Sequence, residues 1–135
     1  MKTQAQLIQF PCHVNDRGSL TFGEYAGQLP FIPIRYFLIT DVPAAALRGG
    51  HAHRTCHQLI IAAAGSCLVS LVDSFGSDEV MLESPTVGVY LPPLTWSEQS
   101  RFASGTVLLV LASEVYDEGD YIRSMSELLE LGGHR

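Results

Sequence analysis

Short runs of apolar and β-branched residues recur along most of this chain, and each run ends at residues that favour turns. The runs occupy residues 7–14, 20–22, 35–40, 59–63, 67–72, 80–83, 87–91 and 106–112. The segments between them carry Pro, Gly, Asn, Asp or Ser, which set the backbone angles of tight turns. Short strands at such regular spacing are typical of a β-sandwich or barrel and not of alternating strand–helix units. The pattern therefore predicts an all-β fold of roughly eight to ten strands.

Only the C-terminal segment changes its period. From Tyr121 onward the apolar residues recur every three or four positions, which indicates a helix with one buried face. Asp117 or Asp120 can cap the start of this helix, and the Gly132-Gly133 pair can end it. One short C-terminal α-helix is therefore expected after the strands.

Length and composition fit one compact unit. A chain of 135 residues can bury a full hydrophobic core, so residues 1–135 are expected to form a single domain. Charged residues make up 16% of the chain and hydrophobic residues 47%, which is unlike a disordered protein. The formal net charge of -6 disfavours nucleic acid as a partner. A small polyanion stays possible, because it needs only a few local arginines.

The cysteines and the N-terminus bear on where the protein works. Cys12, Cys56 and Cys67 are odd in number and lack the spacing of a disulfide framework or a zinc knuckle, so free thiols are expected. The N-terminus lacks the apolar core of a signal peptide, and no apolar run reaches membrane-spanning length. A cytoplasmic protein without a membrane partner is predicted.

Residues 48–58 concentrate the chemistry of the chain. The stretch reads RGGHAHRTCHQ and holds three of the five histidines. In an extended strand alternate side chains share a face, so His51, His53 and His57 are expected to point the same way. Thr55 belongs to the same predicted face. Imidazoles two residues apart lie about 7 Å apart along a strand, which is close enough to act on one small ligand.

More than one chemistry is compatible with these histidines. Their spacing resembles the first metal-binding motif of cupins, and three histidines can hold Zn²⁺ or Fe²⁺ with open positions. The later turn, however, offers Ser97 where a metal cupin brings a further histidine. Two neutral imidazoles can instead take and return a proton near neutral pH, which suits transfer between neighbouring carbons through an enediol. Histidines hydrogen-bonded within the core are the structural alternative.

Several cationic and aromatic side chains are candidates for holding a ligand. The cationic candidates are Arg17, Arg35, Arg48 and Arg54. Arg48 and Arg54 flank the first two histidines, and an arginine fork binds phosphate through two hydrogen bonds. A ligand role is favoured for Arg17 and Arg48 over surface ion pairs. Trp96 and Tyr90 either supply a stacking wall or belong to the core.

Two blocks of the sequence resemble the sugar 3,4-ketoisomerases of the cupin superfamily, which are the WxcM-related enzymes of deoxysugar pathways. The first block, RGGHAHR, covers residues 48–54, and the second, YDEGDYIR, covers residues 116–123. Further similar segments lie at residues 16–20, 29–31, 58–60, 87–90, 93–98 and 110–113. The two blocks are specific together, and the resemblance spans essentially the whole chain.

The resemblance implies a cupin-like jelly roll, a homodimer formed through the N-terminal strands, and a reaction without a metal or other cofactor. Such enzymes move a proton between C3 and C4 of dTDP-4-keto-6-deoxyglucose through an enediolate, and so exchange a keto and a hydroxyl group. On this sequence, His51 would be the base that removes the C3 proton, and His53 would assist it. The residues expected to hold the nucleotide sugar are Arg17, Arg35, Arg48 and Trp96.

Three positions depart from the pattern of the resemblance. Phe37 lacks a phenolic group, Ser97 stands where related chains often have histidine, and His57 replaces a residue that is commonly not histidine. The first two bear on the face of C4 that is reprotonated, so the galacto or gluco configuration of the product stays open. The nucleotide is inferred by analogy alone. Two alternatives remain: a non-catalytic cupin that binds a nucleotide sugar, and a metal-dependent cupin enzyme.

Overall fold

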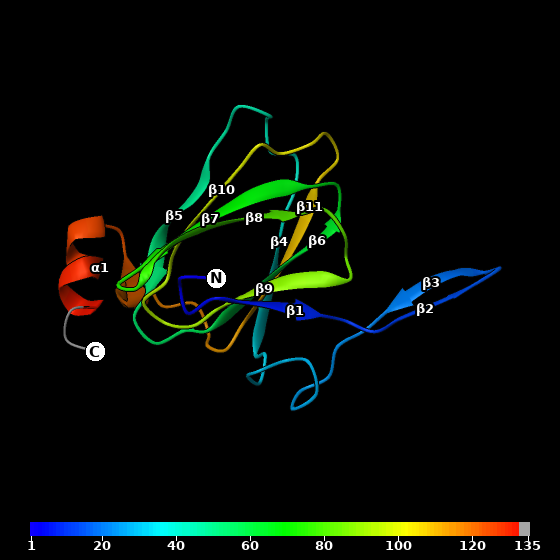
Figure 1. Ribbon diagram of the computed structural model, residues 1–135, viewed down its shortest axis with the longest axis horizontal. Coiled ribbons are helices and arrows are strands. Elements are labelled where there is room, and N and C mark those ends of the chain that lie inside the picture. Colours follow the sequence, from blue (N-terminus) through cyan, green and yellow to red (C-terminus); the bar gives the residue numbers. More distant parts are fainter. Residues whose placement is uncertain (133–135) are drawn as a thin grey trace.

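Two five-stranded antiparallel sheets face each other in the computed structural model, which describes residues 1–132 (Figure 1). The first sheet has the order β1 (Gln6–Gln9), β9 (Val87–Leu91), β6 (Gln58–Ala64), β11 (Val107–Ala112), β4 (Arg35–Ile39). The second has the order β12 (Tyr121–Ile122), β5 (Arg48–His53), β10 (Trp96–Ser100), β7 (Cys67–Asp73), β8 (Gly76–Leu82). From β4 onward, consecutive strands lie in opposite sheets except for the paired strands β7 and β8. The fold is therefore a jelly roll, and the all-β prediction is confirmed.

The main core lies between the two sheets, because their strands alternate buried and less buried side chains. In β11, Leu108 and Val110 are buried and face the interior, while the residues between them lie on the outer face. Val69 and Leu71 of β7 meet them from the second sheet, and all four belong to one cluster. Each such side chain contributes about 1.5–3 kcal/mol by leaving water. This packing gives the site a rigid support.

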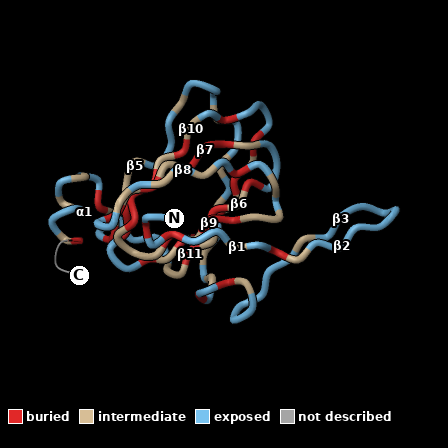
Figure 2. Tube along the Cα trace, viewed as in Figure 1, coloured by how far each residue is buried: buried red, intermediate tan, exposed pale blue. Residues whose placement is uncertain are grey.

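The N-terminal segment forms two strands where a single one was predicted. Pro11 lacks a backbone N–H, and the pairing of β1 with β9 ends before it. The chain then continues into a hairpin of β2 (Cys12–Asn15) and β3 (Gly18–Thr21) that projects away from the sheets (Figure 1). The hairpin is exposed along most of its length (Figure 2). It carries apolar side chains in solvent, with Val14 74% exposed and Leu20 62% exposed.

The helix prediction is confirmed in kind, but its start is wrong. Tyr121 begins the short strand β12, which pairs with β5, and the helix α1 runs only from Met125 to Gly132. Pairing with the edge of β5 satisfies the backbone hydrogen-bonding groups of residues 121–122, so these residues form a strand and not the start of the helix. Gly133 lies outside the described residues. Among residues 1–132, no helix is both long and apolar enough to cross a membrane.

The turn before β12 is capped as its sequence suggests, although it is not the start of α1. Asp117 precedes a short 3₁₀ helix, Glu118–Asp120, and its side chain accepts a hydrogen bond from the N–H of Gly119 at 2.9 Å. The cap of α1 is instead Ser124, whose Oγ accepts from the N–H of Glu127 at 3.3 Å. The segment Asp117–Asp120 is therefore a separate element, placed beside the end of β5.

Candidate active site

Two consecutive glycines shape the strand that carries the histidines. In the pairing of β5 with β10, His51 lies opposite Ser97 and Gly49 lies opposite Glu98, so Gly50 is an extra residue in a β-bulge. Gly49 and Gly50 have φ values of 81° and 77°, in the left-handed region that favours glycine. A Cβ at Gly49 would lie 2.7 Å from the carbonyl oxygen of Ser97. The local backbone therefore requires glycine.

The bulge changes which side chains share a face. In a regular strand Arg48 and His51, three residues apart, would point to opposite sides of the sheet. With one residue inserted between them, both point between the two sheets and line the same cavity of about 140 Å³. The glycine pair thus brings a guanidinium and an imidazole to one site.

Both polar and apolar side chains line this cavity. The polar and aromatic members are Arg48, His51, Gln58, Ser97, Gln99 and Tyr121. The apolar members, apart from Gly49, are Phe37, Ile39, Ile60 and Val110. A small pocket with apolar walls and a few converging polar groups is the usual form of a ligand site.

The first two histidines form a pair, as predicted. The ring centroids of His51 and His53 are 5.1 Å apart, and the two rings are perpendicular. The ring of Tyr121 packs on both, at 4.8 Å from His51 and 4.5 Å from His53. His51 lines the cavity, whereas His53 lies behind it and is only 6% exposed.

Both imidazoles are neutral near pH 7. Burial lowers the pKa of His51 from 6.5 to about 4, and the neighbouring His53 lowers it further, while a hydrogen bond to the backbone of Gly49 opposes the shift. Burial also lowers the pKa of His53, against the raising effect of its hydrogen bond and charge interaction with Asp120. A neutral imidazole has a free lone pair, so this pair can accept a proton from a bound ligand.

Asp120, from the 3₁₀ turn, holds His53 from behind. The Nδ1 of His53 lies 2.9 Å from Oδ2 of Asp120. The other oxygen, Oδ1, accepts hydrogen bonds from the N–H of Thr55 at 2.8 Å and from its hydroxyl at 3.1 Å. Burial alone would raise the pKa of Asp120, but these hydrogen bonds from Thr55 and His53 lower it below its ordinary value. Asp120 is therefore a carboxylate.

The prediction that His57 and Thr55 share the face of the histidine pair is wrong. Strand β5 ends at His53, and the chain bends at Arg54 and Thr55 before β6 begins. His57 then lies against the aromatic rings of Phe31 and Tyr90, and its Nδ1 is 2.7 Å from the Tyr90 hydroxyl. The three histidines are consequently not brought to one metal site.

A different trio has donor atoms close together. One ligand atom from each of His53, Cys56 and Asp120 lies within 4.8 Å of the others, and all three residues are buried. His53 and Asp120 already pair through a hydrogen bond, which accounts for their proximity without a metal. The arrangement is therefore a hydrogen-bonded histidine–carboxylate pair with a buried thiol beside it.

Two of the predicted ligand-binding arginines lie near the histidine pair. Arg48 lines the cavity. Arg35 does not line it, but its guanidinium is 5.5 Å from the ring of Phe37, which does, and 5.8 Å from the ring of Tyr116. The Nε of Arg35 also donates to the carbonyl oxygen of Glu114 at 3.1 Å. Its charge thus lies beside Phe37, a member of the cavity lining.

The other two predicted binding residues are placed elsewhere in the chain. Arg17 lies in the turn of the projecting hairpin, away from the histidine cavity (Figure 1). Trp96 is buried in a cluster with Ala52, Ile122 and Leu128, and its Nε1 donates to Glu98 at 3.2 Å. The core role left open for Trp96 is the one the structure supports, because its ring faces the helix side of the second sheet and not the cavity.

Sequence reasoning missed several members of the site. Gln58, Gln99 and Tyr121 line the cavity, and Asp120 holds His53. Asp120 and Tyr121 fall inside the YDEGDYIR block. That block indicated the family, but it did not indicate what these two residues do in the site. Gln58 and Gln99 are buried glutamines in strands, and the Nε2 of Gln99 donates to Oγ of Ser97 at 3.2 Å. No pattern in the sequence marks either of them.

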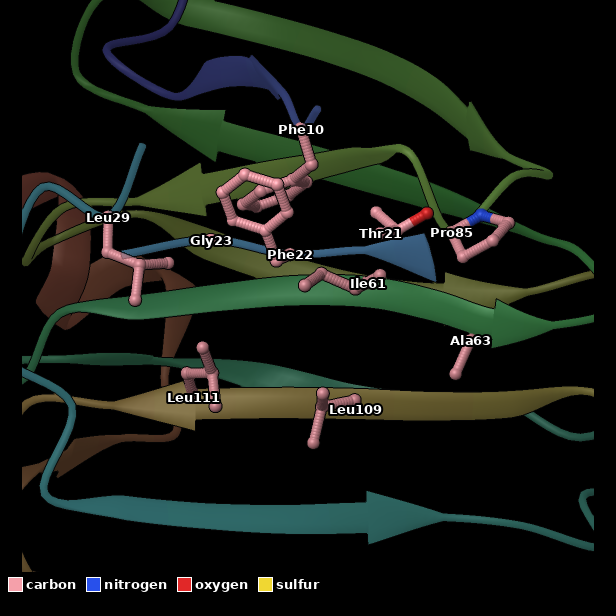
Figure 3. Close-up of a pocket in the computed structure, with 10 residues that line it drawn as sticks. All are labelled: Phe10, Thr21, Phe22, Gly23, Leu29, Ile61, Ala63, Pro85, Leu109 and Leu111. Atoms are coloured by element: carbon pink, nitrogen blue, oxygen red, sulfur yellow. The ribbon is translucent and has the colours of Figure 1, made fainter. Parts of the chain in front are cut away.

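A second and larger cavity lies on the outer face of the first sheet. It has a volume of about 340 Å³ and lies between strands β6 and β11 and the N-terminal segment that includes Phe10 and Phe22 (Figure 3). Its side chains are apolar apart from Thr21, and it contains no titratable group. Of these two cavities, only the smaller is lined by titratable side chains.

A jelly roll whose inter-sheet cavity is lined by one histidine of a pair has the architecture of the cupins. A family model described as FdtA, WxcM-like, C-terminal, matches residues 3–132. The chain therefore belongs to this family, and the predicted kinship with the cupin-type sugar 3,4-ketoisomerases is confirmed.

Named relatives agree with this assignment. The chain is 41% identical over 118 residues to the TDP-4-oxo-6-deoxy-alpha-D-glucose-3,4-oxoisomerase of Aneurinibacillus thermoaerophilus, covering 87% of this chain and 85% of the relative. A mutant of the 3,4-ketoisomerase QdtA from Thermoanaerobacterium thermosaccharolyticum, in complex with TDP-4-keto-6-deoxyglucose, is 37% identical with a TM-score of 0.95, covering 100% of this chain and 98% of that one. A 3,4-ketoisomerase from Helicobacter canadensis is 33% identical with a TM-score of 0.91, covering 96% and 98%.

Proposed function

We propose that this protein is a sugar 3,4-ketoisomerase that converts dTDP-4-keto-6-deoxyglucose into a dTDP-3-keto-6-deoxyhexose for deoxysugar biosynthesis. The observation that carries the proposal is the neutral imidazole of His51 in a cavity shared with Arg48. The relatives support the substrate class, because they are named for this reaction and one of them was crystallised with TDP-4-keto-6-deoxyglucose.

The reaction moves one carbon-bound proton and exchanges the bonding of two oxygens. A base removes the C3 proton, the C–H electrons form a C3=C4 double bond, and the C4 carbonyl becomes an enolate oxygen. The C3 hydroxyl then loses its proton and becomes the new carbonyl, while C4 and its oxygen each receive a proton. Oxidation at C3 equals reduction at C4, so the sugar itself balances the electrons.

The side chains of the cavity fit these steps. His51 is neutral and lines the cavity, so it is the base that takes the C3 proton and returns it to C4. Arg48 supplies positive charge, and Gln58 and Gln99 supply amide donors, for the enediolate oxygens. The apolar wall that includes Phe37 keeps the charges of the intermediate out of bulk water.

The cavity is too small for the whole substrate. Pockets that enclose a drug-sized ligand span about 300–1,000 Å³, and this one has about 140 Å³. The hexose therefore enters between the sheets, and the diphosphate and base stay at the mouth. Arg35 and the exposed ring of Tyr116 lie together near Phe37 and are the side chains available to the nucleotide there.

The active protein in this proposal is a homodimer that forms through the N-terminal hairpin. Val14 and Leu20 on the hairpin are exposed, and so are Tyr36 (68%) and Leu38 (57%) on the outer face of the edge strand β4. Exposed apolar surface of this extent is typical of an interface. Arg17 is remote from the cavity of its own chain, so a ligand role for Arg17 requires that the hairpin reach a second copy.

The dimer is tested by size-exclusion chromatography with light scattering. The wild-type protein is expected at twice the chain mass, and the Leu20→Glu variant at the chain mass, because a carboxylate at the interface is costly to bury. Exposed Ser126→Glu, on α1, is the matched control and is expected to stay dimeric. A wild-type protein at the mass of one chain overturns the dimer.

The activity is tested by incubating the protein with dTDP-4-keto-6-deoxyglucose in D₂O and following the sugar protons by NMR. Loss of the C3 proton signal together with a new 3-keto product is the expected result. A protein that binds TDP but causes no exchange is a non-catalytic nucleotide-sugar cupin instead. Activity that is lost after chelation and restored by a metal overturns the metal-free reaction proposed here. A cytoplasmic location completes the proposal, supported by the free thiols of Cys12, Cys56 and Cys67.

A further inference from the structure

We propose that Asp120 is a positioning residue that fixes His53 with its proton on Nδ1, so that Nε2 is left as a proton acceptor beside His51. The inference rests on the proposed isomerase function for its role in turnover. The tautomer itself is a property of the free protein, so it can be measured without substrate and without turnover.

Asp120 is held on all sides in a way that suits this task. Its backbone N–H donates to the carbonyl oxygen of Asp117 at 3.0 Å, and its carbonyl oxygen accepts from the N–H of Arg54 at 2.9 Å. Its Oδ1 accepts both hydrogen bonds of Thr55. Main chain and side chain are thus tied to the bend that follows β5, and only Oδ2 is left for His53.

The tautomer follows from the chemistry of the pair. A carboxylate can only accept, so the 2.9 Å contact requires that Nδ1 of His53 carry the hydrogen. Nε2 of neutral His53 then has a lone pair. Among the described residues this atom has no hydrogen-bond partner, although it is fully buried. Buried polar atoms are nearly always paired, so an unpaired acceptor here indicates a group kept ready for a proton.

The surroundings of His53 fit a proton-accepting role. Its ring is perpendicular to that of His51, the proposed base, at 5.1 Å between centroids. Protonation of either ring gives the pair a positive charge, and Asp120, bonded to His53, supplies a compensating negative charge. Among the other charged groups near His53, Arg35 on β4 opposes protonation and Glu114, which follows β11, favours it. Asp120 is the group in hydrogen-bond contact with His53, and its negative charge favours the protonated ring.

The experiment compares Asp120→Asn with Asp117→Asn in the full chain. Asp117 lies in the same turn, carries the same charge and makes no contact with His53, and asparagine can keep its cap to Gly119. In ¹⁵N-histidine NMR of the substrate-free protein, His53 is expected with Nδ1 protonated in the wild type and in Asp117→Asn. It is expected to shift toward the Nε2-protonated form in Asp120→Asn, because an amide NH₂ can donate to Nδ1.

Turnover gives the second readout. Asp120→Asn is expected to lower kcat by about 100-fold or more with little change in KM, since acid–base groups contribute about 10²–10⁴-fold. Because Asp120 raises the pKa of His53, its loss is also expected to move the acid limb of the kcat profile to lower pH. Asp120→Glu, which keeps a carboxylate, is expected to recover part of the rate.

Each outcome decides the inference. An unchanged His53 tautomer in a folded Asp120→Asn overturns it, and so does a loss of rate equal to that of Asp117→Asn. If Asp120→Asn does not fold, Asp120→Ser, which removes the carboxylate but keeps a small polar side chain, takes its place. A shift of the tautomer signals away from the Nδ1-protonated form and of the acid limb to lower pH then supports the inference, and no shift overturns it. Wild-type protein without isomerase activity overturns the function alone, since the NMR signals are read without substrate.

Discussion

The two faces of the first sheet carry cavities of opposite character. Ile60 and Val110 point between the sheets and line the small histidine cavity. Their sequence neighbours Ile61, Leu109 and Leu111 point outward and line the larger apolar cavity (Figure 3). The inner cavity holds several polar groups, whereas the outer one is lined by apolar side chains apart from Thr21. The polar groups of a cavity, and not its volume, therefore indicate which cavity can support a reaction in this fold.

Replacing a histidine on each side of this divide should have the most unequal effect. His51→Asn is expected to lower kcat by about 10³-fold or more, because it removes the base, and to leave the unfolding midpoint within a few degrees. His57→Asn, in the same histidine-rich stretch but on the outer side of the first sheet, is expected to change kcat by no more than about twofold. NMR of the keto sugar and thermal unfolding measure both variants. Equal losses of activity would remove the distinction between the two histidines.

Adjacent isoleucines provide a comparison of stability across the same sheet. Ile60 is buried in the core between the sheets. Ile60→Ala is therefore expected to lower the free energy of unfolding by about 3 kcal/mol, because it removes the buried side-chain carbons beyond Cβ and leaves a cavity. Ile61 is only partly buried, and Ile61→Ala is expected to cost about 1 kcal/mol. Urea unfolding at one protein concentration measures the two. A larger loss for Ile61→Ala would show that the outer face is the better packed one.

The glycine pair can be broken one residue at a time. Gly49→Ala is expected to cost about 2–3 kcal/mol, because its Cβ meets the Ser97 carbonyl oxygen in addition to the positive φ. Gly50→Ala has the same kind of φ but open space around its Cβ, so about 1 kcal/mol is expected. The stabilities come from urea unfolding, and the KM of Gly49→Ala is expected to rise as Arg48 and His51 shift. Equal costs for both would mean that the contact with β10 does not matter.

Acid should destabilise the inner cavity through His51. Its folded-state pKa of about 4 lies below the 6.5 of an exposed imidazole, so the unfolded chain binds more protons between these values. Stability is therefore expected to be full above about pH 6.5 and to fall by about 1–2 kcal/mol by pH 4, allowing for solvent at the partly exposed ring. Unfolding of wild type and His51→Asn at pH 7 and pH 4.5 measures this. An identical pH dependence in the variant would assign the effect to other groups.

Features set by residues close together in the chain, such as the strands and the face that a side chain occupies, were predictable from the sequence. Alternation along strands indicated an all-β fold, and it placed His51 and His53 on one face, because both residues lie within a single extended segment. The paired blocks RGGHAHR and YDEGDYIR indicated the family that the comparisons then showed. Arg48 was predicted to hold the ligand, and the structure places it at the cavity through a bulge that the sequence did not reveal.

The tertiary structure decided where the local rule stops and which distant segments meet. The bend at Arg54 and Thr55 sends His57 to the outer face, and no periodicity of the sequence marks the residue at which a strand ends. Asp120 reaches His53 from 67 residues away only because β12 pairs with β5. Trp96 could line a pocket or join the core, and α1 covers it. Pairing and packing between remote segments settle such positions, since their free energy comes from contacts that do not exist until the sheets have closed.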